Sequence, residues 1–370
     1  MKFTTTKNNL FKTLNEVNKV IPLRTTLPIL NCVLIKTKKQ KITLIATDLE
    51  QTIISELEGK VLSEGETALP CGRFLEIVSA LPNEELEIET KKDNETKINS
   101  SKGIYKITGK EPSEYPTVPD REKKQEIVLE GNELLEIINA TLYATSKDDL
   151  KPALCGVYLN IIKNNVTAVA TDGHRLVKYN KQVENNNPEG SIIVPGKFFN
   201  ILKNGINIKE KITINISENH LDVKQNQSCL ITRIIKESFP DFNSVIPEEL
   251  NIKASLKTEE VIKGLKRVSI FSNKSTKQIL IEFNQNELII STEDKETRSS
   301  AKEHLECEYN NENITIAYNA QFLKEVLEHI HCPEVEVFLS GPLTAAVFKP
   351  KKEAETTKHT ALLMPLRRQK

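Results

Sequence analysis

The sequence predicts an α+β protein made of three copies of one module, each with two helices packed on antiparallel β-sheet. The chain has 370 residues, more than one compact core accommodates. Similar stretches recur about 120 residues apart, which indicates an internal repeat. Within each copy, runs of β-type residues surround two short runs with helical spacing.

The clearest repeat covers a predicted strand, a turn and a second strand. It reads KITLIATDLEQTIISELEG from Lys41, NVTAVATDGHRLVKYNKQV from Asn165 and ELIISTEDKETRSSAKEHL from Glu287. A β-rich run precedes it in each copy, and a strand, a turn, a short helix and a further strand follow it. The three copies therefore predict one fold used three times.

Each copy is expected to open on a helix with apolar residues along one face of a 3.6-residue period. The residues at i, i+1, i+4 and i+7 are Leu10, Phe11, Leu14 and Val17; Leu134, Leu135, Ile138 and Thr141; and Val261, Ile262, Leu265 and Val268. The opposite face of the third helix carries Lys263, Lys266 and Arg267. One face is expected to pack while the other offers positive charge.

Polar, proline-rich stretches separate the copies. EPSEYPTVPDREKKQ closes the first copy and SFPDFNSVIPEELN the second. The predicted domains are residues 1–124, 125–250 and 251–370.

Composition restricts the classes of function. With 28% charged and 38% hydrophobic residues, the chain is typical of a globular protein. No apolar run approaches the roughly 20 residues of a membrane span. The N-terminal stretch lacks the apolar region of a signal peptide, so a cytoplasmic protein with no membrane partner is expected. Six cysteines stand singly, as reduced thiols do, and the formal net charge is zero, so affinity for nucleic acid must come from local patches.

The segment ATDGHRL, residues 170–176, resembles part of an active site. In the first copy, however, Thr47 and Asp48 are followed by a different Leu-Glu-Gln sequence. Thr171 and Asp172 are therefore interpreted as a structural strand-to-turn signal, and Gly173 as the residue of a tight turn. Only His174 and Arg175 are then left for a specific role.

No other catalytic or metal-binding pattern accompanies that segment. HIHC, residues 329–332, has one weak His spacing and sits where a helix is expected to end. Phosphate loops, dinucleotide fingerprints and nucleophile elbows are missing from the sequence. We expect a binding protein with no catalytic residue, no metal and no cofactor.

Several motifs together resemble one family. LPIL (residues 27–30), ATD (46–48), ATDGHRL, FPDF (239–242) and the C-terminal LLMPLR (362–367) match the bacterial DNA polymerase III beta subunits, the processivity sliding clamps, in order and spacing. The resemblance covers essentially the whole chain. It implies three clamp-fold domains, a head-to-tail homodimer that forms a six-domain ring, and sequence-independent sliding along double-stranded DNA.

The resemblance also implies a cleft between the second and third domains that binds a short linear peptide, broadly a Gln followed by spaced Leu and Phe. The implied partners are the DNA polymerase III alpha subunit, the clamp loader and other proteins with a clamp-binding motif. The matching positions are Leu154, Thr171, Gly173, His174, Arg175, Leu176, Pro240, Val245, Leu362, Met364, Pro365 and Leu366, with Asn319 and Phe322 near the rim.

Two further sets of residues follow from the resemblance. Candidate DNA-binding residues are Arg24, Lys147, Lys151, Arg175 and Lys197. Basic residues of the family pattern are replaced here by Gly72, Gly196 and Asn204. Candidate dimer-interface residues are Tyr105 and Ile107 on an edge strand, Arg73 and Ile77 on the second helix, and Ile270 and Phe271 after the helix that opens the third copy.

Two alternative functions remain open at this point. One is an enzyme on the same scaffold that uses Asp172 and His174, although a nucleophile or metal is missing from the pattern. The other is a paralogue that has lost DNA loading and only docks proteins. Retention on circular DNA separates both from a sliding clamp.

Overall fold

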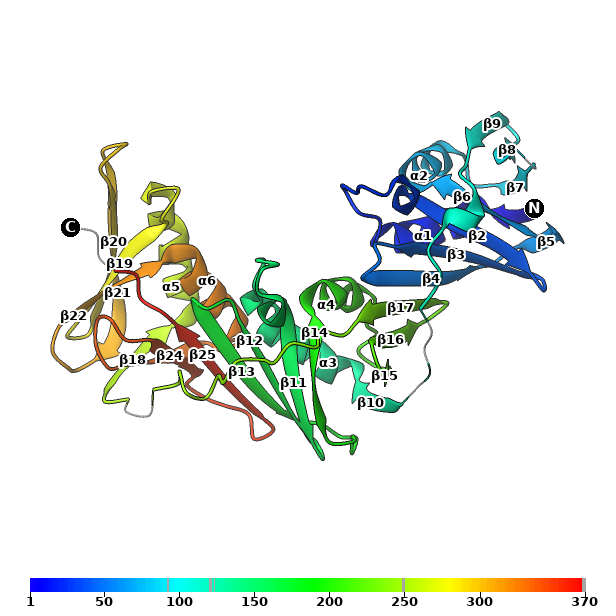
Figure 1. Ribbon diagram of the computed structural model, residues 1–370. Coiled ribbons are helices and arrows are strands. Elements are labelled where there is room, and N and C mark those ends of the chain that lie inside the picture. The colour runs from blue at the N-terminus through cyan, green and yellow to red at the C-terminus, as the bar shows by residue number, and fades with distance from the viewer. Residues whose placement is uncertain (92, 120–121, 123, 248–249, 368–370) are drawn as a thin grey trace. The chain divides into compact units, whose positions relative to one another are not determined.

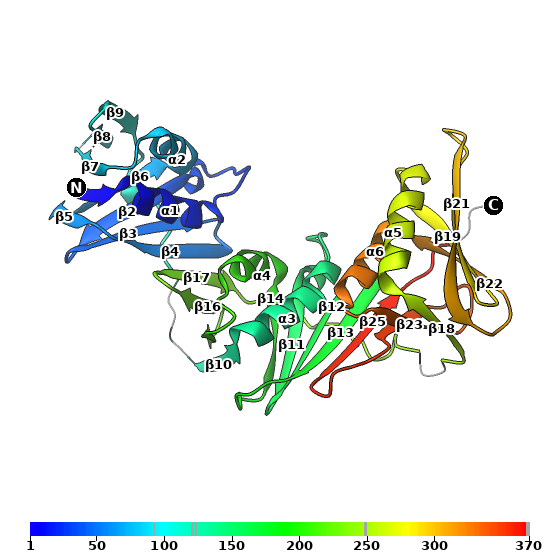
Figure 2. The same ribbon diagram turned by 180° about the vertical axis from the view of Figure 1, so that it is seen from behind.

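The computed structural model describes residues 1–91, 93–119, 122, 124–247 and 250–367. Figure 1 shows its helices and strands in chain order, and Figure 2 shows the same ribbon from behind. Each copy of the repeat contains two α-helices against antiparallel strands, which confirms the predicted α+β class.

The opening helices bury the stripe that the sequence predicts. They are α1 (Lys7–Asn18), α3 (Gly131–Thr141) and α5 (Thr258–Val268). In all three, the residues at i, i+4 and i+7 are buried while the residue at i+1 is half-buried. The stripe therefore sets the face on which each helix packs. The second helices are α2 (Cys71–Ala80), α4 (Gly196–Leu202) and α6 (Ala320–His329).

Helices pair on one side of the strands. In the first copy, α1 contacts α2, and in the third copy α5 contacts α6, as Figures 1 and 2 show. A large core cluster lies under α5 and α6, between those helices and the strands of the third copy. Burial of this apolar surface is the main stabilising contribution to the third copy.

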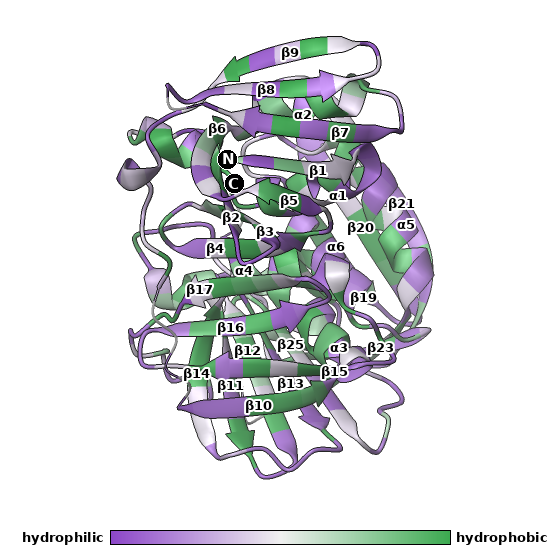
Figure 3. Ribbon diagram, turned by 90° about the vertical axis from the view of Figure 1, so that its right-hand side faces the viewer, coloured by the Kyte–Doolittle hydropathy of each residue, from purple (hydrophilic) through white to green (hydrophobic). Residues whose placement is uncertain are grey.

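A five-stranded sheet belongs to the first copy. In spatial order its strands are β5 (Lys60–Ser63), β1 (Lys2–Thr6), β7 (Glu85–Thr90), β8 (Glu95–Ser100) and β9 (Gly103–Thr108). Polar and apolar residues alternate along β7, with Leu86 and Ile88 buried, and Figure 3 shows the alternation. This period of two is what a sheet covered on one face requires. The strand β9 stands at the sheet edge.

An eight-stranded sheet joins the first and second copies. Its order is β10 (Gln125–Glu130), β15 (Lys211–Ile216), β16 (His220–Gln225), β17 (Ser228–Arg233), β4 (Gln51–Leu57), β3 (Lys41–Thr47), β2 (Cys32–Lys38) and β6 (Gly65–Pro70). The strand that follows the first ATD turn, β4, pairs with β17, the last strand of the second copy.

A twelve-stranded sheet joins the second and third copies in the same way. Its order is β14 (Gly190–Pro195), β11 (Gly156–Ile162), β12 (Asn165–Thr171), β13 (Arg175–Gln182), β25 (Thr357–Leu363), β24 (Ala346–Pro350), β23 (Glu334–Leu339), β18 (Ile252–Lys257), β21 (Ser299–Tyr309), β20 (Glu287–Asp294), β19 (Gln278–Asn284) and β22 (Ile314–Asn319). Here β13, which follows the second ATD turn, pairs with β25.

These shared sheets decide how the chain divides into compact units. One unit holds residues 1–128 and 201–234, and the other holds residues 129–200 and 235–370. The second copy is split because its last strands hydrogen-bond to the first copy and β13 hydrogen-bonds to the third. The domain limits 1–124, 125–250 and 251–370 stay a prediction.

Candidate functional site

The turn that follows β12 is held by side chains of its own first two residues. The Thr171 hydroxyl donates to the Arg175 carbonyl over 2.6 Å and accepts from the Gly173 amide over 3.1 Å. Asp172 Oδ1 accepts from the His174 and Arg175 amides at 2.9 and 3.0 Å. Gly173 has a φ of 88°, the left-handed region that glycine enters at low cost. The turn thereby fixes where the His174 side chain leaves the sheet.

The first copy builds the same turn with different residues. Thr47 donates to the Gln51 carbonyl over 2.8 Å, and Asp48 Oδ1 accepts from the Glu50 and Gln51 amides at 3.0 and 2.6 Å. Leu49 takes the place of the glycine with a φ of 79°. The prediction that the Thr-Asp pair is structural is confirmed by these matching hydrogen bonds.

Arg175 is buried, and each of its three side-chain nitrogens has a partner. Its side chain is 7% exposed, and Nε donates to Asp172 Oδ2 over 3.1 Å. Nη1 pairs with the Glu325 carboxylate of α6, and Nη2 donates to the Tyr143 carbonyl over 2.6 Å. The guanidinium also lies over the rings of Tyr143 and Phe322. A phosphate therefore has no access to this charge, so the structure contradicts the prediction that Arg175 binds DNA.

Glu325 keeps its negative charge in this setting. Burial alone would raise the pKa of its carboxyl group, but hydrogen bonds from Gln321 and Arg175 together with the Arg175 charge outweigh burial and hold the pKa below its ordinary value. The Glu325 carboxyl group is therefore ionised at neutral pH. Because Glu325 lies in the third copy, its pairing with Arg175 ties the second-copy turn to α6.

The C-terminal segment attaches to both copies. The Met364 amide donates to the His174 carbonyl over 2.9 Å, and the Leu366 amide donates to the Ala317 carbonyl of β22 over 2.7 Å. The Met364 side chain stays 46% exposed, and Pro365 and Leu366 are half-buried. His174, in the middle of the second copy, and Met364, near the end of the third, are thus neighbours.

Apolar side chains form a floor beneath this point. Leu176 of β13 and Leu362 of β25 are register partners, and both are almost fully buried. They share a cluster with Val169, Ala345 and Val347. The floor is continuous across the joint between the second and third copies.

The segment that follows β17 packs against the same cluster. Phe239 stacks on Tyr158 with ring centroids 5.1 Å apart, and Phe242 lies under the Lys178 ammonium. Within this segment, Pro240 is exposed and Val245 is 53% exposed. The segment presents apolar side chains to solvent near a buried apolar cluster, as recognition surfaces do.

The remaining predicted site residues lie at the ends of short helices. Leu154 is half-buried in the 3₁₀ turn Pro152–Cys155. Asn319 is the N-cap of α6, and its Oδ1 accepts from the Gln321 and Phe322 amides at 2.9 and 3.3 Å. The cap fixes the start of α6 and with it the place of Phe322.

The predicted DNA-binding residues other than Arg175 are exposed. Arg24 follows α1 in a loop, and Lys147 and Lys151 lie in the equivalent loop of the second copy. Lys197 is exposed in the first turn of α4. The basic face of α5 is partly neutralised, because Lys263, Lys266 and Arg267 pair with Glu259, Glu328 and Glu303.

The predicted interface residues of the first copy fall into two groups. The segment around Tyr105 forms the edge strand β9, as predicted. Ile107, however, is only 4% exposed because its side chain faces the interior, while Ile104 is 66% exposed. The part that Ile107 plays in the interface stays a prediction, and Ile104 is the more exposed apolar side chain of the strand. On α2, Arg73 is exposed and Ile77 is half-buried.

In the third copy, apolar side chains lie in solvent beside an open strand edge. Ile270 and Phe271 of the 3₁₀ turn Ser269–Phe271 are 77% and 42% exposed. The strand β21 pairs with β20 over residues 299–306 but with β18 only over residues 307–309. Residues 299–306 therefore offer one unpaired edge among the described pairings.

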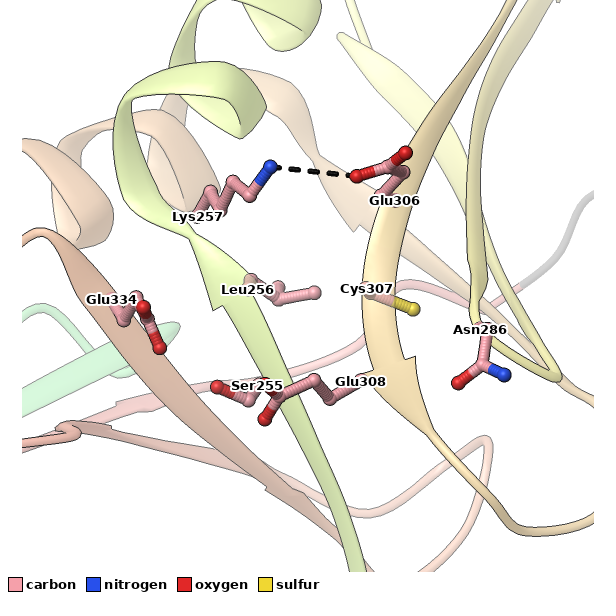
Figure 4. A pocket seen from close by; sticks show the side chains of 8 residues that line it. All are labelled: Ser255, Leu256, Lys257, Asn286, Glu306, Cys307, Glu308 and Glu334. Atoms are coloured by element: carbon pink, nitrogen blue, oxygen red, sulfur yellow. Dashed lines mark hydrogen bonds and ion pairs between the residues drawn. The ribbon is translucent and has the colours of Figure 1, made fainter.

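Other hollows lie apart from the ATDGHRL turn. Figure 4 shows one of about 390 Å³ beside β18 and β21, where Lys257 pairs with Glu306 over 3.4 Å. Burial raises the pKa of the Cys307 thiol there to about 11, so it is not a thiolate nucleophile at neutral pH. A second hollow of about 380 Å³ contains His329, His331 and His359.

In the HIHC segment, His329 and Cys332 contact other protein groups. His329 stacks on Tyr143 with centroids 4.1 Å apart, and its Nδ1 lies 2.7 Å from the Glu325 carbonyl. The Cys332 thiol donates to the Glu334 carbonyl over 2.8 Å. Among the described residues, no group of three His, Cys, Asp or Glu side chains is arranged to hold a metal ion.

In the part of the chain that the structure describes, no helix is both long and apolar enough to cross a membrane.

Three residues at these sites were not predicted from the sequence. Glu325 and Tyr143 complete the surroundings of Arg175, and Ile104 is the exposed apolar residue of β9. The only sequence signal for Glu325 is its place on a helix three residues after Phe322, which puts both on one helix face.

Family models of the DNA polymerase III beta subunit match three consecutive parts of the chain. The N-terminal, central and C-terminal domain models match residues 1–119, 128–241 and 243–367. The beta sliding clamps of Chlamydia pneumoniae and Staphylococcus epidermidis are each 27% identical to the chain, and each match covers 99% of both chains. A crystal structure of a DNA polymerase III beta subunit from Eubacterium rectale has a TM-score of 0.91 at 26% identity and covers 99% of this chain and 100% of its own. The sliding clamp of Bacillus subtilis has a TM-score of 0.92 at 23% identity and full coverage of both chains, which shows a shared fold.

Proposed function

Because the chain belongs to the DNA polymerase III beta subunit family and is a sliding clamp, we propose that it tethers its partners through a peptide site at His174 and Met364. A sliding clamp is a processivity factor and not a catalytic subunit. Its function is to keep a polymerase on double-stranded DNA. What remains to be assigned is which residues bind partners, DNA and a second copy.

The observation that carries the peptide site is the hydrogen bond between the Met364 amide and the His174 carbonyl, 2.9 Å long. It joins an exposed, adaptable apolar side chain to an exposed ring above the buried floor of Leu176 and Leu362. Met is well suited to bind varied apolar side chains because it is flexible and polarisable. The occupants are linear peptides of the DNA polymerase III alpha subunit, the clamp loader and other proteins with such a motif.

The proposed DNA contacts are Arg24, Lys147, Lys151 and Lys197. Their support is exposure and charge, in loops or a helix start rather than in the core. Contacts of this kind go to phosphate groups, carry no sequence information and weaken with salt. These properties suit a protein that must slide.

The proposed homodimer uses the two open strand edges. The edge of β9 in one copy of the chain pairs with residues 299–306 of β21 in the second copy, and two such contacts close a head-to-tail ring. Lys102 and Lys106 beside or in β9 complement Glu303 and Glu306 of β21 in charge. Ile104 and Ile270 supply exposed apolar surface at the two sides. The proposed location is the cytoplasm, where bacterial replication takes place.

The test of the clamp function is retention on circular DNA. A clamp loader places the labelled protein on a nicked circle, and gel filtration then separates DNA-bound from free protein. We expect retention on the circle and release after the circle is cut, because nothing but topology holds the ring. Protein that stays bound to linear DNA, or that never loads, would contradict the proposal. The control is the variant Ile270→Ala with Phe271→Ala, which as a monomer cannot encircle DNA.

A further inference from the structure

A column of stacked groups runs from the ATDGHRL turn into the joint between the second and third copies. The His174 ring stacks on Phe322, with centroids 5.8 Å apart and planes 25° apart. The Arg175 guanidinium lies 4.7 Å from the Phe322 centroid and 5.1 Å from the Tyr143 centroid. Tyr143 in turn stacks on His329 at 4.1 Å. Of these five groups only His174, at one end, is exposed.

Within the column, the Arg175 side chain binds to groups from both copies. Asp172 and the Tyr143 carbonyl come from the second copy, and Glu325 comes from α6 of the third. A guanidinium can serve three acceptors and stack on two rings at once, because it is planar and carries its donors in a fixed fork. A lysine ammonium has the same charge but neither the fork nor the flat faces.

The same turn also positions the C-terminal segment. The His174 carbonyl accepts from the Met364 amide, so the direction in which the turn points decides where Met364 sits. The turn alone does not fix the orientation of the His174 ring, because that side chain is exposed. The ring stacks on Phe322 of the third copy. The ring is held from the third copy.

We propose that Arg175, Glu325 and Phe322 are positioning residues for the peptide site, which hold the His174 ring and the Met364 backbone in their binding arrangement. The proposal rests on the peptide site proposed above. The Arg175 side chain is 7% exposed and each of its three nitrogens has an acceptor within the protein, so its proposed role is to hold the neighbouring groups. Phe322 and Glu325 lie in α6, so a displacement of α6 against the second copy changes the wall of the site. Peptide affinity is therefore tied to the joint between the two copies.

The experiment compares two substitutions on α6 that remove one carboxylate each. Glu325→Gln keeps the shape of the side chain but removes the charge that Arg175 needs. Glu328→Gln, three residues further along, is the matched control, because Glu328 pairs with Lys266 and Lys324 outside the column. Arg175→Lys keeps the charge and loses the fork. The probe is a fluorescein-labelled peptide with a Gln followed by spaced Leu and Phe, and its binding is followed by fluorescence anisotropy.

A second readout separates positioning from simple destabilisation. The His174 ring proton resonances, assigned with His174→Gln, report the ring current of Phe322. We expect Glu325→Gln and Arg175→Lys to bind the peptide about tenfold more weakly and to shift these resonances. Glu328→Gln should match the wild type in both measurements. Phe322→Tyr, which retains the ring, should keep the resonances, and Phe322→Leu should lose the ring-current shift.

The outcomes distinguish this inference from the proposed function. If the wild type binds the peptide, Met364→Ala weakens binding and folded Glu325→Gln binds as the wild type does with unchanged His174 resonances, the positioning role is overturned while the peptide site stands. If the wild type does not bind the peptide at all, both are overturned. If Arg175→Lys fails to fold, Glu325→Gln and its control still decide the matter.

Discussion

Acid is expected to weaken the joint between the second and third copies through one buried histidine. His359 lies in β25 opposite Tyr179 of β13, and the two rings meet edge-on at 5.4 Å. Its side chain is nearly completely buried, and Nε2 has no hydrogen-bond partner among the described residues. Burial, with smaller contributions from His331 and His329, lowers the pKa of His359 to about 4. The imidazole is therefore neutral in the folded protein at neutral pH.

The size of the effect follows from the two protonation states. In the unfolded chain a histidine has a pKa of about 6.5, so between pH 6.5 and about 4 the unfolded chain binds a proton that the folded protein does not. The contribution of the neutral His359 to the free energy of unfolding is fully present above pH 6.5 and is lost as the pH falls toward 4. Between pH 7 and pH 5 the loss is about 2 kcal/mol. The other titratable groups that line the same hollow are Glu136, Lys181, His329, His331, Lys352 and Glu353.

The assay is urea unfolding of the wild type and His359→Gln at pH 8, 7, 6 and 5. At pH 8 the imidazole is neutral in both states, so the difference between the proteins measures the packing change alone. At pH 5 the variant should have gained about 2 kcal/mol relative to the wild type, because glutamine does not titrate. Carboxylates titrate in both proteins and cancel. Parallel stability curves for the two proteins from pH 8 to pH 5 would refute the reasoning.

Three further predictions concern the proposed contacts. Ile270→Ala with Phe271→Ala should give a monomer in sedimentation velocity, because two exposed apolar side chains leave the seam; an unchanged dimer would reject that seam. Met364→Ala should weaken peptide binding about tenfold in calorimetry, the effect of losing one apolar contact, and wild-type affinity would move the site elsewhere. Lys147→Glu with Lys151→Glu should weaken binding to duplexes of any sequence and lower the slope of log affinity against log salt by about 2, while an unchanged slope would remove both lysines from the DNA contacts.

The internal repeat made the scaffold predictable, because residues that recur at equivalent positions of the copies are those that serve the fold. Thr47 and Thr171 make equivalent hydrogen bonds, although the residues after them differ. The helical stripe was predictable for the same reason, since burial follows the 3.6-residue period in all three copies. Local pattern and repetition together therefore specify the elements.

Contacts between distant parts of the chain were not predictable. Glu325 is 150 residues from Arg175 in sequence, and an ion pair at that separation leaves no local signal. Which of Ile104 and Ile107 is exposed was not predictable for another reason. The two positions differ by an odd number of residues, so they face opposite sides of β9, and the strand alone does not say which side is covered. The five-stranded sheet decides it by burying Ile107.

The two ATD turns lie at two joints with the same backbone pairing, yet the proposed peptide site lies at only one of them. At the first joint β4 pairs with β17, and the Arg233 amide donates to the Glu50 carbonyl over 3.0 Å. At the second joint β13 pairs with β25, and the Met364 amide donates to the His174 carbonyl over 2.9 Å.

The hydrogen bond is the same at both joints, but the side chains beside it are not. Glu50 and Arg233 place two exposed, oppositely charged groups at the first joint, where an apolar peptide would have to displace hydrated charge. His174 and Met364 place a ring and a thioether at the second joint, above buried leucines. One backbone arrangement therefore yields a polar joint after the first ATD turn and, after the second, the apolar surface that we propose as the peptide site. The difference arises from the residues that follow Thr-Asp and from those that follow the last strand.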